Sequence, residues 1–254
     1  MDYLLLLIAG LLAGGMNALA GGGTFFSFPA LLACGLPPVT AGATNCVALW
    51  PASIAAAWAA RPALRPLGRW LLPLLAAALL GGTAGGLLLL AGGDGTFRVL
   101  IPWLLLIATL LFAASPALGR WLAARRGLDG QLPPHGVLSL GSHVLVSLYG
   151  GYFGAGMGIL QLATFAIEGH ELRRANALKN LLSALIYSIA SLTFILAGKI
   201  SWPELAILLT GATLGGYAGG LLGNRLPARW LRALVLSVGS SMTLYYFATT
   251  FFSG

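Results

Sequence analysis

The hydrophobic positions of this chain fall into long uninterrupted runs. Six runs are long enough to cross a hydrocarbon core of about 30 Å as helices, and they occupy residues 41–60, 70–91, 97–118, 178–197, 204–223 and 231–251. Two further regions, 3–34 and 136–168, are also apolar but contain clusters of glycine. Lipid offers no hydrogen-bond partners to the backbone, so a segment inside the membrane must form a helix or part of a closed barrel. The pattern therefore predicts an all-α polytopic membrane protein.

Composition supports this class. Of the 254 residues 58% are hydrophobic and 8% are charged, with a mean hydropathy of +0.90, whereas soluble domains carry about a quarter charged residues. The N-terminal segment, residues 1–20, begins with Asp2 and contains no Lys or Arg. A signal peptide begins with positive charges, so we expect this segment to be retained. No metal-ligand spacing, nucleotide-binding loop or nucleophile–base pair is evident in the sequence, so we expect no enzyme activity, no cofactor and no nucleic-acid partner.

The chain repeats itself at an offset of 135 residues. The match needs no gap and includes glycines, asparagines and aromatic residues: Gly15 with Gly150, Gly21 with Gly156, Gly23 with Gly158, Asn45 with Asn180, Ser53 with Ser188, Gly81 with Gly216 and Phe112 with Phe247. We infer an internal duplication, with an N-terminal repeat over 1–118, a linker over 119–135 and a C-terminal repeat over 136–254.

Positive charges predict the orientation. They gather in four connections, which the positive-inside rule places in the cytoplasm: Arg61, Arg65 and Arg69; Arg120, Arg125 and Arg126; Arg173, Arg174 and Lys179; and Arg225, Arg229 and Arg232. The linker 119–135 is thus predicted to be cytoplasmic and both termini extracytoplasmic. The net charge of +8 concerns topology and lipid contact more than substrate.

The two glycine-broken regions must then each enter and leave on one face, so each is predicted to be a helical hairpin. In the first, the arm 24–34 is only about 16 Å long as a helix and cannot cross the membrane alone. Each repeat becomes a glycine-tipped hairpin plus three transmembrane helices, and the second copy is inserted upside down. Inverted repeats of this kind are common in secondary transporters, whose substrate sites lie where broken helices meet.

The hairpin tips are predicted to bind an anion. Gly21, Gly22 and Gly23 permit a tight turn before the arm that begins near Thr24, and Gly156 and Gly158 do so before an arm that begins near Ile159. Two helix N-termini that face each other at mid-membrane favour negative charge. The alternative, that glycines only allow close helix packing, is the one we expect at 81–86 and 215–220.

Polar side chains near the tips are the other candidate substrate ligands. Asn45 and Asn180 lie near the starts of equivalent spanning helices, and Gln161 lies close to the second tip. Such groups are costly in a membrane unless they have partners, so bracing of the tips is an equal alternative to ligand contact. Lys179 can pair with an anion or extend to the cytoplasmic surface.

Three titratable residues near the second hairpin are candidates for proton coupling: His143 on its first arm, and Glu168 with His170 at its cytoplasmic end. The alternative for each histidine is a hydrogen-bonded packing residue. Asp94 and Glu204 are expected to be ordinary loop charges, and Cys34 and Cys46 small buried residues.

The segments around the tips resemble a known family. Residues 20–45, which contain Gly-Gly-Gly-Thr and end at Asn45, together with Gly150–Gly158 and Asn176-Ala-Leu-Lys-Asn180, resemble the paired signatures of the TauE/SafE family of sulfite and organosulfonate transporters. The resemblance covers both halves and implies a bacterial inner-membrane carrier of sulfite, sulfoacetate or related anions, often an exporter. One departure is Thr164, which stands where the first copy has Pro29.

The sequence as a whole predicts a secondary transporter of small anions in a lipid bilayer, working by alternating access around two opposed hairpin tips. Sulfite or organosulfonates are the favoured substrates, and export is the favoured direction. An anion channel or passive pore is the alternative, and it requires a continuous water path.

Overall fold

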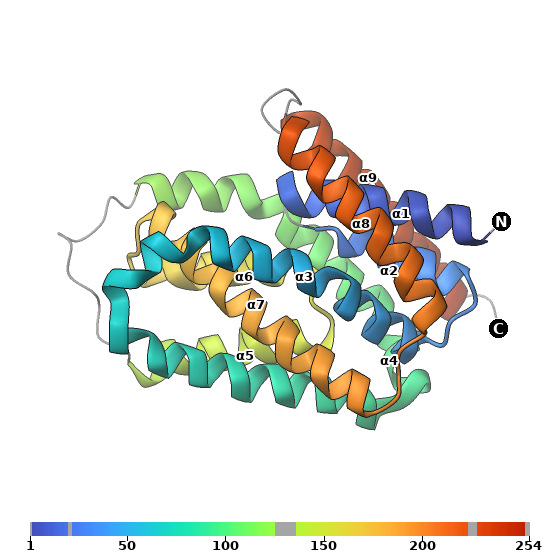
Figure 1. Cartoon of the computed structure of the whole chain (residues 1–254), viewed down its shortest axis with the longest axis horizontal. Helices are drawn as coiled ribbons and strands as arrows, with labels where there is room; N and C mark the ends of the chain where they lie inside the picture. The colour runs from blue at the N-terminus through green and yellow to red at the C-terminus, as the bar shows by residue number, and fades with distance from the viewer. Residues whose placement is uncertain (1, 20–21, 125–135, 223–227, 252–254) are drawn as a thin grey trace.

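The computed structural model describes residues 2–19, 22–124, 136–222 and 228–251, and within these ranges the chain is helical and has no strand. The all-α prediction is therefore confirmed. In chain order the elements are α1 (Asp2–Leu19), α2 (Thr24–Ala33), α3 (Pro38–Leu64), the 3-10 helix η1 (Arg65–Leu71), α4 (Leu72–Ala124), α5 (Val137–Tyr152), α6 (Met157–Ile167), α7 (Leu172–Leu196), α8 (Trp202–Leu222) and α9 (Ala228–Phe251). Figure 1 shows these elements with the long axis of the molecule horizontal.

Several predicted boundaries shift. The runs 70–91 and 97–118 are two helices, as predicted, which meet at Gly93 (φ 67°) within the element labelled α4, and the second continues to Ala124. The first part of the predicted linker 119–135 is thus helical, and residues 125–135 lie outside the described residues. The arginine-containing connection after the run 41–60 is not an open loop, because α3 reaches Leu64 and η1 follows directly.

The helices have the length and composition of membrane spans. Leu67–Ala117, Arg173–Leu196 and Ala233–Phe251 are each long and apolar enough to cross a bilayer, and the first contains the kink at Gly93. α3 and α8, at 27 and 21 residues, also reach the length of a span. Large apolar side chains such as Leu80, Tyr217 and Leu244 are exposed on the outside, as expected of a surface that faces lipid.

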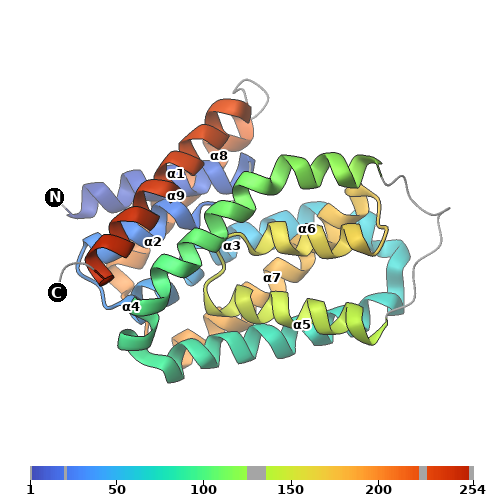
Figure 2. The ribbon, with the colours of Figure 1, turned by 180° about the vertical axis from the view of Figure 1, so that it is seen from behind.

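The two ends of the molecule differ. Figure 1 places the N and C termini at one end, which we call the terminal end. Seen from either side, η1 and the turn between α6 and α7 lie at the opposite end, which we call the corner end (Figure 2). At the corner end the ring of Trp70 in η1 packs edge-on against His170, with centroids 5.3 Å apart.

Glycines allow the first arm of each hairpin to pack tightly on a helix from the other half of the chain. α1 contacts α8 most extensively, and α5 contacts the first part of α4 in the same way. A Cβ added at Gly14 or Gly215 would overlap the backbone of the partner helix, and so would one at Gly81 or Gly85. The prediction that the glycines at 81–86 and 215–220 serve close packing is confirmed.

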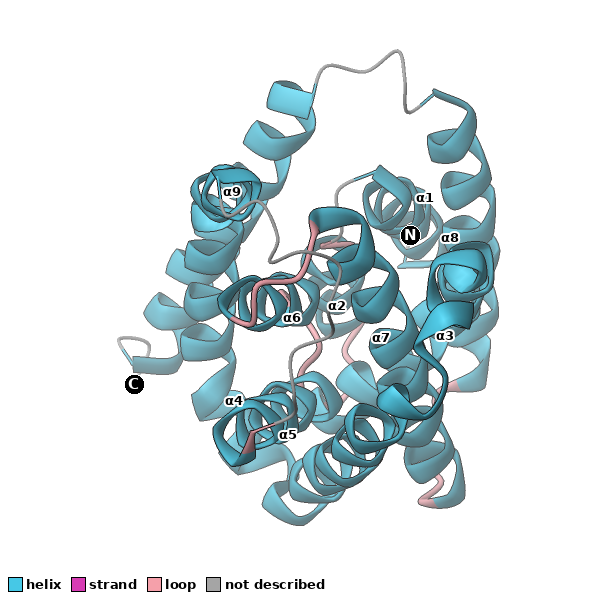
Figure 3. Ribbon diagram, turned by 90° about the vertical axis from the view of Figure 1, so that its left-hand side faces the viewer, coloured by secondary structure: helices cyan, strands magenta, loops and turns pink. Residues whose placement is uncertain are grey.

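The short helices α2 and α6 lie in the middle of the molecule, surrounded by the longer helices when it is viewed along the long axis (Figure 3). Residues Thr24–Leu31 of α2 are all buried. Phe28 of α2 packs against Phe97 of α4 and Phe153 before α6, with ring centroids 5.9 and 5.5 Å apart. These rings fix the second arm of the first hairpin beside the tip of the second.

The prediction of ordinary loop charges at Asp94 and Glu204 is wrong. Asp94 lies at the kink of α4, and its Oδ1 accepts a hydrogen bond from the backbone N–H of Val39 in the first turn of α3, at 2.8 Å. Glu204 lies in the first turn of α8 and accepts a hydrogen bond from the Ser201 hydroxyl. A carboxylate near a helix N-terminus stabilises the positive end of the helix dipole, so both residues stabilise helix starts.

Candidate functional site

Both hairpins turn at glycines with positive φ. Gly22 (φ 101°) precedes α2, and Gly154 (φ 81°) and Gly156 (φ 77°) precede α6. This is a backbone conformation that L-residues with a Cβ adopt at a cost of about 1–2 kcal/mol. α2 starts at Thr24 as predicted, whereas α6 starts at Met157, slightly before the predicted Ile159. The tight turns predicted from the glycine clusters are confirmed where the structure describes them.

The helices that follow the tips begin without side-chain caps. Among the described residues, neither Gly23 at the start of α2 nor Gly156 at the start of α6 makes a side-chain cap hydrogen bond. The first turns make short backbone contacts, such as Phe26 N to Gly23 O at 3.0 Å and Ile159 N to Gly156 O at 3.0 Å. An uncapped helix N-terminus carries partial positive charge and favours an anion nearby.

A cavity of about 160 Å³ lies between the two tips. Its lining includes Gly22 and Gly23 of the first tip, Gly154–Gly158 of the second, and side chains from α1, α2, α3, α4, α6 and α7. Lys179 is the one cation among the described residues that line it. The cavity continues from the tips along α6 and the first half of α7, toward the corner end.

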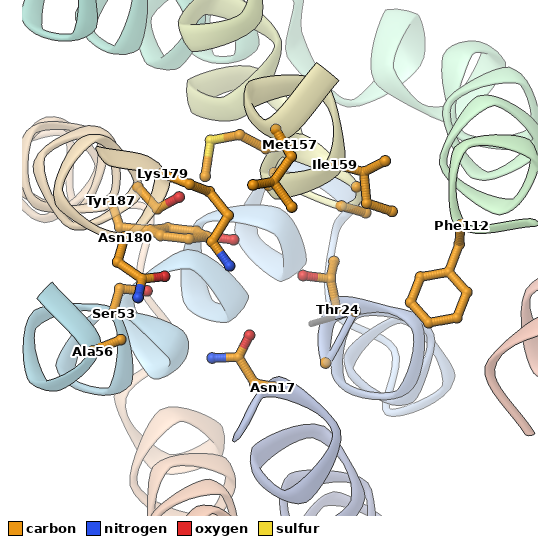
Figure 4. Close-up of a pocket in the computed structure, with 18 residues that line it drawn as sticks. Asn17, Thr24, Ser53, Ala56, Phe112, Met157, Ile159, Lys179, Asn180 and Tyr187 are labelled. Carbon is orange, nitrogen blue, oxygen red and sulfur yellow. The ribbon is translucent and has the colours of Figure 1, made fainter. Parts of the chain in front are cut away.

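The wall of the cavity is polar on one side and apolar on the other. Lys179, Asn180 and Ser53 lie on the polar side, where Tyr187 also lines the cavity, and Asn17 and Thr24 point inward between the two sides (Figure 4). Phe112 and Ile159 lie on the apolar side, and Met157 lies close to Lys179. This arrangement offers one positive charge and several neutral hydrogen-bonding groups to a small ligand.

Two tyrosines hold the tips in place. Tyr149 of α5 donates a hydrogen bond to the carbonyl of Ala155 within the second tip, at 2.7 Å. Tyr187 of α7 is hydrogen-bonded to Thr24, and its hydroxyl lies 3.0 Å from the place where a Cβ on Gly154 would be. Tyr187 therefore contacts both hairpins at once.

Most of the predicted site residues come together at the cavity, which Gly22, Gly23, Thr24, Gly156, Gly158, Lys179 and Asn180 all line. Lys179 does not extend away to the surface: its side chain is half-buried, and its Cδ lies 3.3 Å from the place where a Cβ on Gly158 would be. Gly21 lies outside the described residues.

Asn45 and Gln161 do not line the cavity. Asn45 is 3% exposed, and its Oδ1 accepts a hydrogen bond from the Ser27 hydroxyl of α2. Gln161 is 1% exposed and accepts a hydrogen bond from Ser183 at 2.9 Å, so it lies behind a cavity residue. The expected equivalence of Asn45 and Asn180 as cavity ligands is therefore corrected: Asn45 braces α2 against α3, and Asn180 faces the cavity.

The region around Asn45 is tightly closed. Thr44 accepts a hydrogen bond from the backbone N–H of Ser201 at 3.1 Å, and the thiol of Cys46 lies 3.6 Å from the Ser191 hydroxyl. A little further along α3, Trp50 donates to the Ser188 hydroxyl at 2.7 Å. These contacts seal α3 against α7 and the start of α8, on the side of the tips away from the cavity.

His143, Glu168 and His170 form a separate cluster at the corner end. Oε1 of Glu168 lies 3.0 Å from Nε2 of His143, and Oε2 lies 3.5 Å from Nε2 of His170. Within the described part of the chain, no group of His, Cys, Asp and Glu side chains is arranged to hold a metal ion.

Sequence reasoning missed Tyr187, Ser183, Met157 and Ile159 as cavity residues. Ser183 and Tyr187 face the same way as Asn180 because they lie one and two turns further along α7, respectively. Helical spacing from Asn180 was therefore a usable signal for them. Met157 and Ile159 follow from the first turn of α6, whose predicted start was too late.

Comparison with known proteins supports a transport site. The family profile described as "Sulfite exporter TauE/SafE" matches residues 6–246, nearly the whole chain. The chain belongs to the TauE/SafE family. The resemblance predicted from the tip segments is confirmed.

Curated relatives of this TauE/SafE chain carry transporter names. The "Probable membrane transporter protein YfcA" of Escherichia coli strain K12 is 31% identical over 242 residues, which cover 94% of this chain and 87% of the relative. A "Probable membrane transporter protein" of Haemophilus influenzae is 26% identical, with 94% and 92% covered. The "Probable membrane transporter protein ORF9" of Sinorhizobium sp is 25% identical, with 94% and 90% covered. No solved structure matches the chain significantly.

Family membership and these names place the chain among multi-pass membrane transporters rather than enzymes. The tip glycines that the structure describes, Gly22 and Gly23 of the first hairpin and Gly154, Gly156 and Gly158 of the second, line one cavity and lie within the stretch that the family profile matches.

The contrast between the two asparagines gives a test. Asn180→Ala removes a group that faces the cavity and is expected to weaken anion binding about ten-fold or more, since a hydrogen bond to a charged ligand contributes about 1.5–3 kcal/mol. Asn45→Ala removes the acceptor that joins Ser27 of α2 to α3, leaving the Ser27 hydroxyl with the Gly23 carbonyl alone, and is expected to lower the melting temperature with little change in affinity. Affinity and melting temperature measured on both variants distinguish the roles. An affinity loss in Asn45→Ala equal to that in Asn180→Ala would contradict the assignment.

Proposed function

We propose that this chain is a secondary transporter of small anions, with sulfite or organosulfonates such as sulfoacetate as substrates and export as its direction. The observation that carries the proposal is the cavity in which the uncapped N-termini of α2 and α6 meet Lys179. A mobile anion is the ligand that this combination favours, because two helix dipoles and one cation attract it while neutral amides and hydroxyls orient it.

Alternating access is supported by the way the halves pack. Each half contains a hairpin followed by longer helices, and each first arm packs on a helix of the other half, α1 on α8 and α5 on α4. Such crossed packing is what two inverted repeats over 1–118 and 136–254 require. With the linker in the cytoplasm, the terminal end is extracytoplasmic and the corner end cytoplasmic, in a bacterial inner membrane.

The conformation then corresponds to a state open toward the cytoplasm. Lys179 and Asn180 line the cavity, whereas Thr44 and Asn45, their counterparts at the offset of 135, are buried and hydrogen-bonded. Leu162 of α6 lines the cavity, whereas its counterpart Ser27 of α2 is bonded to Asn45. The positions that line the cavity in the second half are thus packed and hydrogen-bonded in the first half. Alternating access around fixed tips requires such a difference between the halves.

The proposal is tested by flux into proteoliposomes that contain the purified protein. Sulfite, sulfoacetate, sulfate and chloride are offered over a range of concentrations. We expect saturable uptake of sulfite or sulfoacetate and little uptake of chloride. Monodisperse protein that moves none of the four anions would contradict the proposal, and so would flux that rises linearly with concentration.

A further inference from the structure

The cluster at the corner end joins three parts of the chain. His143 lies on α5, Glu168 and His170 lie in the turn between α6 and α7, and Trp70 of η1 packs on His170. Ser139, one turn before His143, donates a hydrogen bond to Oε1 of Glu168 at 2.5 Å. Phe165 lies against both imidazoles, with centroid distances of 4.7 Å to His143 and 5.5 Å to His170. Both imidazoles thus pack against aromatic rings, and the Glu168 carboxylate lies between them and is partly exposed.

The carboxylate is the fixed charge of the cluster. Burial alone would raise the pKa of Glu168, but its contacts with His143, His170 and Ser139 outweigh burial and lower the pKa to about 2. A lowered pKa means that the ionised form is present at every pH above about 2 and is lost only as the pH falls through that value. Near neutral pH any proton that the cluster takes up must therefore reside on an imidazole.

Few other charges act on the cluster. Among the described residues, Glu168 forms ion pairs with the two histidines alone. The nearest charged groups along the chain are Arg69 on η1 and Glu171, Arg173 and Arg174 at the start of α7, and none of these four forms an ion pair with a described residue. On α5 the polar group that faces Glu168 beside His143 is the hydroxyl of Ser139.

The hydrogen bonds determine where protons lie. An ionised carboxylate only accepts hydrogen bonds, so Nε2 of His143, 3.0 Å from Oε1, carries a hydrogen and donates it. A further proton on His143 must then bind Nδ1, which is buried and has no hydrogen-bond partner among the described residues. His170 differs, because both of its ring nitrogens are buried and have no hydrogen-bond partner among the described residues, although Nε2 lies 3.5 Å from Oε2 of Glu168. A buried unpaired donor costs about 1–3 kcal/mol.

Proton uptake is consequently linked to movement. A proton on either imidazole gains the attraction of the buried carboxylate but requires a partner for Nδ1 that this conformation does not provide. Protonation therefore favours a second conformation in which the enclosing rings separate and Nδ1 meets water or another acceptor. By linkage, a ligand that shifts the same equilibrium changes proton affinity.

The cluster is connected directly to the cavity. α6 begins at Gly156, in the cavity wall, and ends beside Glu168 after 11 residues, a length of about 16 Å as a helix. α7 begins beside His170 and carries Lys179 and Asn180 into the cavity. A shift of either helix at one end is transmitted to the other end because helices move as rigid elements.

We infer that His143, Glu168 and His170 form a proton-binding site through which the movement of protons is coupled to that of the anion. The inference rests on the proposed transport function. In the conformation seen here both imidazoles are buried. It takes a proton from the aqueous phase at the corner end, where Glu168 is partly exposed, onto an imidazole nitrogen, and returns the same proton when the cluster closes again.

The test uses proteoliposomes with an imposed pH gradient. For the wild-type protein we expect the gradient to drive sulfite or sulfoacetate above equilibrium. Glu168→Gln removes the negative charge of the cluster, and we expect it to accumulate the anion at least ten-fold less than the wild type. It should still exchange the same anion down its concentration gradient, and that exchange shows that the variant is folded. Glu171→Gln is the matched control, since Glu171 is exposed and makes no side-chain cap hydrogen bond, and it should behave as wild type.

Accumulation by Glu168→Gln at the wild-type level would overturn the inference, and so would wild-type exchange on which a pH gradient has no effect. If the wild-type protein moves no anion at all, the proposed function itself fails. Should Glu168→Gln not fold, Ser139→Ala decides. It removes one hydrogen bond to Glu168 and is expected to shift the pH midpoint of gradient-driven uptake, and an unchanged midpoint would overturn the inference.

Discussion

Replacement of Lys179 by Met should weaken anion binding about ten- to hundred-fold and reduce transport accordingly. Lys179 is the one cation among the described residues that line the cavity, and a charge-assisted hydrogen bond to an anion contributes about 1.5–3 kcal/mol. Met is similar in length and keeps the contact with Gly158, so the change removes the charge with little effect on packing. The measurement is the concentration dependence of sulfite or sulfoacetate uptake in proteoliposomes.

Lys199 provides the matched control for Lys179. The chain contains these two lysines, and Lys199 lies exposed in the connection between α7 and α8. Lys199→Met removes the same charge from the protein but leaves the cavity intact, so its uptake should equal that of the wild type. Equal losses in the two variants would mean that net charge rather than the cavity governs transport.

The second large effect is expected at the tip of the second hairpin. Gly156 has φ 77° and lies in the cavity wall, and a Cβ there would contact Ala108 and Leu111 of α4, so Gly156→Val strains the backbone of the tip and adds methyl groups against α4. We expect transport to fall to background while the protein remains in the membrane. Uptake and the amount of folded protein in membrane extracts are measured together.

Gly35 provides a control for the effect of backbone strain alone. It also has positive φ, at 84°, but a Cβ there would meet nothing within 4 Å, and the residue lies between α2 and α3, outside the cavity lining. Gly35→Val therefore carries similar backbone strain at a position outside the cavity wall and should retain most of the transport. Wild-type uptake by Gly156→Val would remove the second tip from the substrate site.

The fold elements that could be predicted from the sequence are those set by local chemistry. The glycines before α2 and α6 predict turns because few other residues adopt positive φ, and the structure has Gly22, Gly154 and Gly156 in that conformation. Long apolar runs predict spanning helices for the same local reason. The boundary errors at Met157 and Ala124 arise because helix ends depend on tertiary contacts that no local pattern contains.

The site was predicted less completely because equivalent residues of its two halves make different contacts. The offset of 135 makes Asn45 and Asn180 equivalent in sequence, yet one bonds to Ser27 and the other faces the cavity. Sequence symmetry predicts equivalent positions, and it does not predict which contacts each position makes in one conformation. The orientation of Lys179 toward the cavity likewise depends on the place of α6 beside α7, which the sequence does not contain.

Asp94 shows a second kind of limit. Its partner, the backbone N–H of Val39, is 55 residues away, and no motif signals a carboxylate that stabilises the start of a distant helix. Tyr187 is similar, since its contacts with Thr24 and Gly154 exist only once both hairpins are assembled. Long-range polar contacts of this kind became visible only with the structure.

The central claim is that an anion binds between the two hairpin tips and is carried by alternating access, and counterflow tests it most directly. Proteoliposomes are loaded with unlabelled sulfite or sulfoacetate and diluted into a trace of the same labelled anion. A carrier with a site at Lys179 predicts a transient accumulation of label above its equilibrium level in the wild-type protein and in Lys199→Met, and none in Lys179→Met. Label that only equilibrates in the wild-type protein, without any overshoot, would contradict the account and indicate a channel.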